Sequence, residues 1–196
     1  MIVLASTSAS RRKLLSQAGL DFAAASPPVD EAGLKADLKK TPADAGDIAE
    51  ALAEAKANSV AVLRPDAYVI GADQMLDCDG TWFDKPADRA DARRHLESLR
   101  GKTHRLITAA VIAREGRIIW RCRDTARLTM REFSDEFLVQ YLDQAGDAVT
   151  SSVGAYQLEG LGAQLFEKIE GDFFSILGLP LIPLLGGLRH AGALTT

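Results

Sequence analysis

The first fifteen residues, MIVLASTSASRRKLL, constrain the fold most, because they place a hydroxyl-rich turn between an apolar strand and a helix. The run from Ile2 to Ala5 predicts a short buried strand. The next five residues are small, and three of them are serines. The segment that follows begins with basic residues and continues with an apolar face: Arg11, Arg12, Lys13, Leu14, Leu15 and Ala18. Unpaired backbone N–H groups and the positive end of the helix dipole meet at such a turn, which suits an anion carrying several phosphates. The alternative is that Ser10 only caps the helix and its arginines lie in solvent.

The whole chain has the length and composition of one globular domain with room for two lobes. It has 196 residues, 47% of them hydrophobic, and a net charge of −4. The acidic total argues against a general nucleic-acid binder. No apolar run approaches the roughly 20 residues that span a bilayer, and the charge distribution at the amino terminus does not resemble a signal peptide. Cys78 and Cys122 are too few for a disulfide framework, so two reduced, buried thiols and a cytoplasmic location are expected.

An alanine-rich segment over residues 43–62 predicts a helix, with Ile48, Leu52 and Val60 on one face. Lys56 belongs to the same face, one turn away from Leu52 and Val60. A lysine at such a position either extends along the apolar surface to reach water or points into a cleft that the helix lines, and the second reading is favoured.

Residues 68–76 and 81–83 predict a β-hairpin, with a turn over residues 77–80. Asp73 follows four apolar or small residues within the first strand, where a carboxylate is costly to bury without a cation, a metal or hydrogen-bond donors. Lys85 lies two residues beyond the returning strand. The pair is interpreted either as a structural ion pair or as a proton-accepting or metal-binding carboxylate facing a phosphate-binding lysine.

Further elements follow along the chain. Helices are expected over residues 87–99, from Ser134 onward, over residues 163–169 and after Pro180, with a strand over residues 106–113. Residues 120–131 alternate between apolar side chains and a row that includes four arginines: Arg121, Arg123, Arg127 and Arg131. The row is interpreted as the wet face of an antiparallel sheet in preference to an RNA-binding surface. His104 is expected to make a structural hydrogen bond.

Short motifs across nearly the whole chain resemble those of the Maf family, and they occur in the expected order. The amino-terminal half carries Leu4-Ala5-Ser6-Thr7-Ser8 before Arg11-Arg12, then Val29-Asp30-Glu31, Ala55-Lys56-Ala57, Ile70-Gly71-Ala72-Asp73-Gln74 and Asp84-Lys85-Pro86. The remainder carries Gly101 with His104 and Thr108, then Gly154-Ala155-Tyr156, Glu159-Gly160-Leu161-Gly162, Ile169-Glu170-Gly171 and Gly178-Leu179-Pro180-Leu181.

The resemblance implies a nucleoside triphosphate pyrophosphatase that cleaves between the α- and β-phosphates with a divalent cation, Mg²⁺ or Mn²⁺. It also implies a single α/β domain over residues 1–196, with a mixed, elongated sheet and flanking helices in two lobes around a deep cleft, related to the inosine-triphosphatase fold. Members of the family are often homodimers. Neither a nucleic acid nor a membrane is expected as a partner.

The same resemblance implies the roles of individual residues. Asp73 would accept a proton or organise the metal, and Glu31 would be a second cleft carboxylate near the metal. Four side chains would hold the triphosphate: Ser6, Arg11, Lys56 and Lys85. Arg12 is a further candidate, because the serine turn can be aligned one residue differently.

Two positions, Gln74 and Glu159, vary in the family with the nucleobase, and this chain is similar there to the branch acting on 7-methylguanosine triphosphate. A carboxylate at Glu159 can accept hydrogen bonds from guanine N1–H and the exocyclic amine. Ser151-Ser152-Val153 departs from the Asp-Lys-Ala of many members, which weakens a pyrimidine assignment. The alternative function is a non-catalytic nucleotide-binding regulator of cell division, since some members were first described as inhibitors of septum formation.

Overall fold

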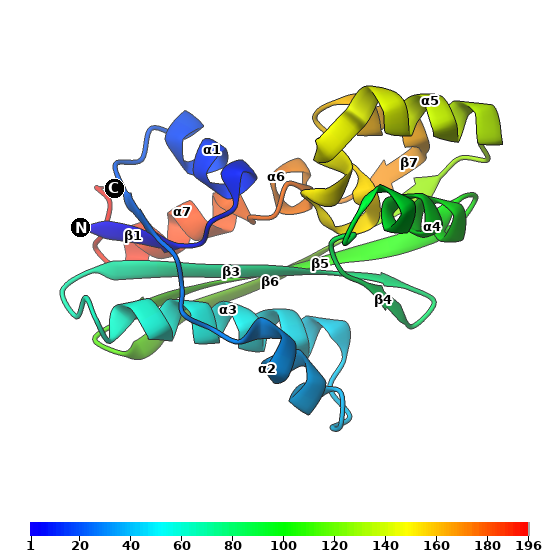
Figure 1. Ribbon diagram of the computed structural model, residues 1–196. Coiled ribbons are helices and arrows are strands. Elements are labelled where there is room, and N and C mark those ends of the chain that lie inside the picture. The colour runs from blue at the N-terminus through cyan, green and yellow to red at the C-terminus, as the bar shows by residue number, and fades with distance from the viewer. Residues whose placement is uncertain (196) are drawn as a thin grey trace. The chain divides into compact units, whose positions relative to one another are not determined.

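The structure is a computed structural model that describes residues 1–195 (Figure 1). Seven strands form a mixed sheet in the order β2-β1-β3-β5-β6-β7, and β4 pairs with β3 outside this path. Their bounds are β1 Ile2–Ala5, β2 Ala23–Ala25, β3 Tyr68–Cys78, β4 Thr81–Phe83, β5 Thr103–Arg114, β6 Arg117–Met130 and β7 Phe166–Glu170. β1 is parallel to β2 and β3, whereas β4 is antiparallel to β3 and β7 to β6. The expected mixed α/β fold is therefore confirmed.

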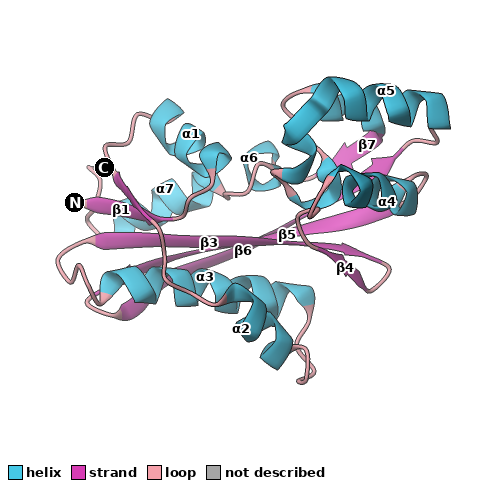
Figure 2. Ribbon diagram, in the orientation of Figure 1, coloured by secondary structure: helices cyan, strands magenta, loops and turns pink. Residues whose placement is uncertain are grey.

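Figure 2 shows the helices and strands of the described residues, and along the chain the helices are interspersed among the strands. The α-helices are α1 Ala9–Gln17, α2 Glu31–Leu38, α3 Ala45–Ala61, α4 Arg89–Leu99, α5 Asp135–Ala145, α6 Phe173–Ile176 and α7 Leu181–His190, and the 3-10 helices are η1 Gly146–Thr150, η2 Val153–Ala155 and η3 Leu161–Leu165. Side chains that accept a backbone N–H cap most α-helices at their start, for example Asp44 at α3 and Ser134 at α5. None of the helices in the described residues combines the length and apolar character needed to cross a bilayer.

The chain divides into two compact units. The first consists of Met1–Gln74, Thr108–Asp124 and the segment from Asp172 to the end of the described residues, and the second consists of Met75–Ile107 and Thr125–Gly171. Each of β3, β5 and β6 has residues in both units.

In the first unit, helices cover both faces of the sheet (Figure 1). On one face, Ile70 and Ala72 of β3 belong to a buried cluster with residues of β1, α1 and α7, among them Leu4, Leu15 and Leu184. On the other face, α3 packs against Gly71, where a Cβ atom would collide with the carbonyl oxygen of Ala53. Because successive side chains of a strand point to opposite faces, Asp73 shares the α3 face with Gly71, and Gln74 shares the face of Ile70 and Ala72.

In the second unit, β3 and β4 form the expected hairpin, and Cys78 pairs with Thr81. The turn is shorter than expected and consists of Asp79 and Gly80, whose φ angles of 52° and 82° fit a two-residue turn between twisted strands. Helix α4 packs against α5, η1 and η2, and its inward residues are the expected Ala92, Leu96 and Leu99.

Two expectations about local structure are wrong. Residues 163–169 do not form one helix: the 3-10 helix η3 ends at Leu165, and β7 follows and pairs with β6 from Met130 to Arg127, so pairing with a neighbouring strand outweighs a short apolar pattern. The cap of α1 is Ser8, not Ser10, and Ala18 at the end of α1 is exposed.

Other expectations hold. The strand over residues 2–5 has the predicted bounds, and residues 120–131 alternate as predicted, with Ala126, Leu128 and Met130 buried and the arginines 121, 123 and 127 exposed. Both cysteines are free thiols, although only Cys78 is buried and Cys122 is half-buried.

Candidate active site

The amino-terminal turn holds Arg11 in the interior of the first unit. The guanidinium donates from Nε to the carbonyl oxygen of Gly178 at 2.7 Å and from Nη1 to Ser6 Oγ at 3.3 Å. Only 9% of Arg11 and 6% of Ser6 are exposed. Arg12, by contrast, is exposed, so the reading in which the arginines of α1 lie in solvent is correct for Arg12 and wrong for Arg11.

Carboxylates lie close enough to Arg11 to influence its ionisation. Burial lowers the pKa of the Arg11 guanidinium, while the negative charges of Asp73 and Glu31 raise it and offset part of that effect. A buried arginine keeps its charge, because the guanidinium does not lose a proton in proteins. The turn therefore contains a fixed positive charge.

Lys56 lies on the buried face of α3 and does not extend to the surface. Its Nζ donates to Asp73 Oδ1 at 2.7 Å and is 2.9 Å from Glu31 Oε2. The side chains of Lys56 and Asp73 are 7% and 10% exposed, whereas that of Glu31 is 48% exposed. The strand carboxylate thus pairs with the helix lysine, and the reading in which Lys56 extends along the apolar surface to reach water is wrong.

Local sequence explains why these groups meet. Asp44 and Asp47 form a capping box that fixes the start of α3. Gly71 lets the backbone of α3 approach β3 closely at Ala53 and Ala57, and Ala57 directly follows Lys56. Asp73 is two residues beyond Gly71 on the same face of β3, so the lysine can reach its carboxylate.

Gln74 points to the opposite face and holds the segment around α6. Its Nε2 donates to Thr108 Oγ1 at 2.8 Å and to the carbonyl oxygens of Ser175 and Ile176 at 3.0 and 3.2 Å. Thr108 Oγ1 itself donates to the carbonyl oxygen of Ser175 at 2.9 Å. These acceptors fix the orientation of the amide, because its nitrogen must face them.

The sequence interpretation missed the role of this segment. The carbonyl oxygen of Gly178 accepts a hydrogen bond from Arg11, and the carbonyl oxygens of Ser175 and Ile176 accept hydrogen bonds from Gln74. Residues 175–178 therefore connect Arg11 to Gln74, the residue that follows Asp73. Gly178 has a φ of 103°, a conformation that favours glycine. The sequence places Gly178 in a motif shared with the family, but nothing in the pattern identified its carbonyl oxygen as a hydrogen-bond acceptor for Arg11.

Two expected site residues, Lys85 and Glu159, belong to the second unit. Lys85 is exposed and lies two residues after β4. Glu159 is exposed in the turn between η2 and η3. The structure brings together five other expected residues, all in the first unit: Ser6, Arg11, Glu31, Lys56 and Asp73.

His104, also in the second unit, makes the expected structural hydrogen bond. Its Nε2 is 2.7 Å from the hydroxyl of Tyr156, and the imidazole is fully buried. Burial lowers the pKa of His104 to about 4, so the ring is neutral at pH 7. Within residues 1–195, burial accounts for this shift, and no negative charge offsets it as a general base would require.

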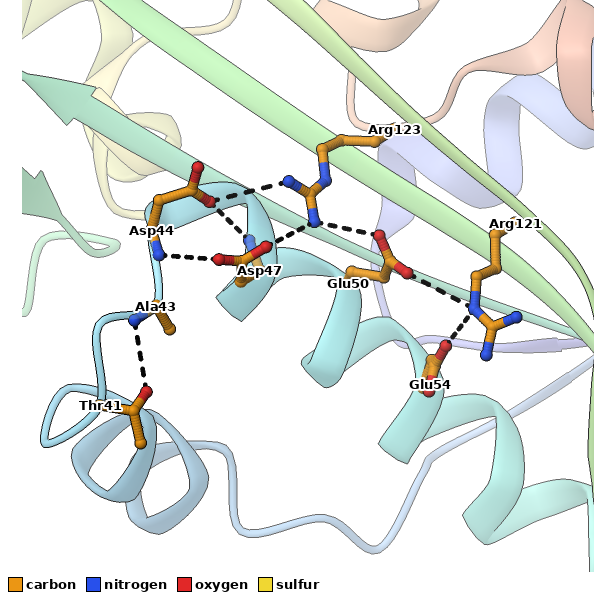
Figure 3. A network of polar contacts seen from close by, with 8 residues as sticks. All are labelled: Thr41, Ala43, Asp44, Asp47, Glu50, Glu54, Arg121 and Arg123. Carbon is orange, nitrogen blue, oxygen red and sulfur yellow. Dashed lines mark hydrogen bonds and ion pairs between the residues drawn. The ribbon is translucent and has the colours of Figure 1, made fainter.

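Two arginines of the β6 row, Arg121 and Arg123, form ion pairs with acidic side chains of α3 (Figure 3). Arg123 lies 3.0 Å from Asp47 and 3.1 Å from Glu50, and Arg121 lies 2.5 Å from Glu54 and 3.4 Å from Glu50. These two arginines are therefore neutralised by the acidic side of α3. The contacts support the structural interpretation of the row over the RNA-binding one.

Within residues 1–195, no group of three or more histidine, cysteine, aspartate or glutamate side chains is placed to hold a metal ion. The two carboxylates expected at a metal, Asp73 and Glu31, nevertheless converge on one nitrogen atom, Lys56 Nζ.

Comparison with known proteins gives a consistent result. The family model described as Maf-like protein matches residues 1–191. A protein of Paramagnetospirillum magneticum named nucleoside triphosphate pyrophosphatase is 55% identical over 192 residues, which are 98% of this chain and 99% of that protein. A protein of Rhodospirillum rubrum with the same name is 52% identical, with 98% and 96% covered. A 7-methyl-GTP pyrophosphatase of Rhizobium etli is 48% identical, with 98% and 97% covered. The chain therefore belongs to the Maf family.

Proposed function

We propose that this protein hydrolyses a nucleoside triphosphate to a nucleoside monophosphate and pyrophosphate. The observation that carries the proposal is the cluster in the first unit, in which buried Asp73 pairs with Lys56 and acts electrostatically on buried Arg11. Relatives covering nearly the whole chain and named for this activity support it. The enzyme is a hydrolase acting on an acid anhydride.

Positive and hydrogen-bonding groups of the cluster would bind the triphosphate. Two of the five N–H groups of Arg11 donate to Gly178 and Ser6 within the described residues. The others can donate to a pair of phosphate oxygens, which a planar guanidinium binds bidentately. Lys56 would contribute a point charge, and the Ser6 hydroxyl a further hydrogen bond.

Asp73 would act on the attacking water. The water oxygen forms a bond to the α-phosphorus while the bond from that phosphorus to the oxygen bridging the β-phosphate breaks. The proton of the water passes to the carboxylate of Asp73, and pyrophosphate leaves with the bonding electrons. The fixed charges of Arg11 and Lys56 would stabilise negative charge on the reacting phosphates.

The carboxylates of this chain suit a divalent cation of the Mg²⁺ type. Asp73 Oδ1 and Glu31 Oε2 both lie within 2.9 Å of one nitrogen, so the two side chains are close enough to share one cation. Magnesium is usually held by one or two carboxylates together with substrate phosphates. When bound, Mg²⁺ or Mn²⁺ would neutralise charge on the triphosphate and the leaving pyrophosphate.

We also propose roles for residues of the second unit on the strength of the resemblance. Lys85 would bind phosphate, and Glu159 would accept hydrogen bonds from a guanine-type base. The name of the Rhizobium etli relative supports a 7-methyl-GTP-type substrate for this chain. A homodimer in the cytoplasm is the proposed form of the protein, and light scattering after gel filtration would test the dimer.

A panel of nucleoside triphosphates with Mg²⁺ or Mn²⁺, assayed for pyrophosphate, tests the function. Asp73→Asn should lower kcat by about 10²-fold or more, the effect of a general base, while nucleotide binding stays measurable. Asp77→Asn is the matched control, because Asp77 is a buried carboxylate of the same strand that pairs with Arg105. Equal loss in both variants would contradict the role of Asp73.

The alternative function, a nucleotide-binding regulator of division without turnover, is decided by the same panel. Tight nucleotide binding without pyrophosphate release from any triphosphate would favour it. The cluster argues for the enzyme, since a sensor has no need of a carboxylate positioned to accept a proton.

A further inference from the structure

The ammonium group of Lys56 lies between the two carboxylates that we assign to the divalent cation. Its Nζ is 2.7 Å from Asp73 Oδ1 and 2.9 Å from Glu31 Oε2. The lysine side chain is 7% exposed, so little water competes for its hydrogen bonds. Lys56 Nζ therefore forms a short ion pair with each of the two carboxylates.

This arrangement balances the charge of the cluster. Two carboxylates carry two negative charges, and the ammonium of Lys56 and the guanidinium of Arg11 carry two positive ones. A charged group in such a buried position is strongly disfavoured without a counter-charge. A divalent cation added to the cluster as it stands would be repelled by two positive charges, and one of them occupies the place between the carboxylates.

The lysine differs from the arginine in the kind of group that holds it. Arg11 is fixed by Gly178 and Ser6, which are neutral partners. Lys56 Nζ is held by the two carboxylates at the end of a flexible four-carbon chain. A triphosphate offers that ammonium several negatively charged oxygens in exchange for the carboxylates.

We propose that Lys56 excludes a divalent cation from Asp73 and Glu31 until the triphosphate of a nucleotide draws its ammonium away. The inference rests on the proposed function and adds an order to it: the cation enters together with the nucleotide, and the protein alone binds it weakly. Lys56 is thus a positioning residue for the metal as well as a phosphate ligand.

Binding of Mn²⁺ to the protein without nucleotide, followed by electron paramagnetic resonance of the free ion, tests this inference. The unmodified protein should bind Mn²⁺ with a Kd weaker than about 1 mM, the weak end of protein sites for divalent cations. Lys56→Met should bind it about ten-fold more tightly or better, because removal of the ammonium leaves the cluster with a net negative charge.

Three further variants locate the effect. Lys13→Met makes the same change of net charge at an exposed position of α1 and should leave the Kd unchanged. Lys56→Met combined with Glu31→Gln should lose the gain, because one of the two carboxylates is removed. Lys56→Arg keeps the charge and should bind Mn²⁺ no better than the unmodified protein. An equal gain in Lys13→Met, or none in folded Lys56→Met, overturns the inference.

The measurement remains decisive where Lys56→Met does not fold, because the unmodified protein alone gives a result. A Kd for Mn²⁺ tighter than about 1 mM without nucleotide, lost in Asp73→Asn, would show that Lys56 does not exclude the cation. A weaker Kd supports the inference. The Mn²⁺ binding measurement contains no nucleotide, so its result does not depend on pyrophosphate release. A protein that released no pyrophosphate in the activity assay would refute the proposed function, and the Mn²⁺ affinities could still be interpreted.

Discussion

Replacement of Gln74 by glutamate tests whether this residue holds the segment around α6. The two side chains have nearly the same shape, but a carboxylate has no N–H to donate. In the structure the amide nitrogen has three acceptors at 2.8 to 3.2 Å, two of them carbonyl oxygens. Gln74→Glu would therefore place negative oxygens against the carbonyl oxygens of Ser175 and Ile176.

The expected loss follows from the hydrogen bonds. A carbonyl left without a donor costs about 1–3 kcal/mol, and Ser175 keeps the bond from Thr108. The free energy of unfolding should thus fall by about 2–4 kcal/mol in Gln74→Glu. Gln74→Met, which lacks both the donors and the charge, should lose less, about 1–2 kcal/mol.

Urea unfolding followed by circular dichroism would measure both variants. Because residues 175–178 also include the acceptor of Arg11, Gln74→Glu should raise the KM for the nucleotide more than Gln74→Met does. If both variants unfold within about 0.5 kcal/mol of the unmodified protein, the amide does not support this segment and our reasoning is refuted.

Two further predictions concern the second unit. Glu159→Gln should raise the KM for 7-methyl-GTP by about ten-fold with less effect on UTP, because an amide offers one acceptor where the carboxylate offers two, and steady-state kinetics on both nucleotides would show it. His104 should make the protein less stable in acid: its pKa is about 4 when folded and 6.5 when unfolded, so below pH 6.5 the unfolded chain binds a proton that the folded chain refuses. The free energy of unfolding should fall by up to about 3 kcal/mol as the pH drops from 6.5 to 4, and His104→Gln should remove that part of the slope in urea titrations; an unchanged slope would contradict the burial argument.

Much of the fold could be predicted because the local patterns agree with the tertiary structure. The apolar run of β1, the alternation of β6 and the inward face of α4 each match their bounds or burial. Residues 163–169 failed because their partner strand, β6, lies more than thirty residues earlier, and a single segment does not reveal long-range pairing. The cap of α1 failed because Ser8 and Ser10 are chemically equivalent and only the backbone decides between them.

The site could be predicted in its residue types and less well in its pairings. A lysine on the apolar face of a helix and a carboxylate in a strand core were both conspicuous. The sequence left open whether Asp73 forms an ion pair with Lys85 or faces it in a functional site, and the structure pairs Asp73 with Lys56. That pairing depends on the close approach of α3 at Gly71, which no periodicity expresses. The contacts of Gln74 and Arg11 with main-chain carbonyls were beyond prediction, because any residue supplies such an acceptor.

The opposite directions of Asp73 and Gln74 have a consequence for how this strand can evolve. A single inserted or deleted residue in β3 ahead of Asp73 would turn each of the two side chains to the opposite face of the strand, so that the carboxylate would leave the face of Lys56 and the amide would leave the face of α6. Point substitutions at position 74 can accumulate without such a reversal, whereas length changes in this part of the strand would remove both functions in one event. We therefore expect lineages of this protein to vary in length at their loops and to keep β3 free of gaps.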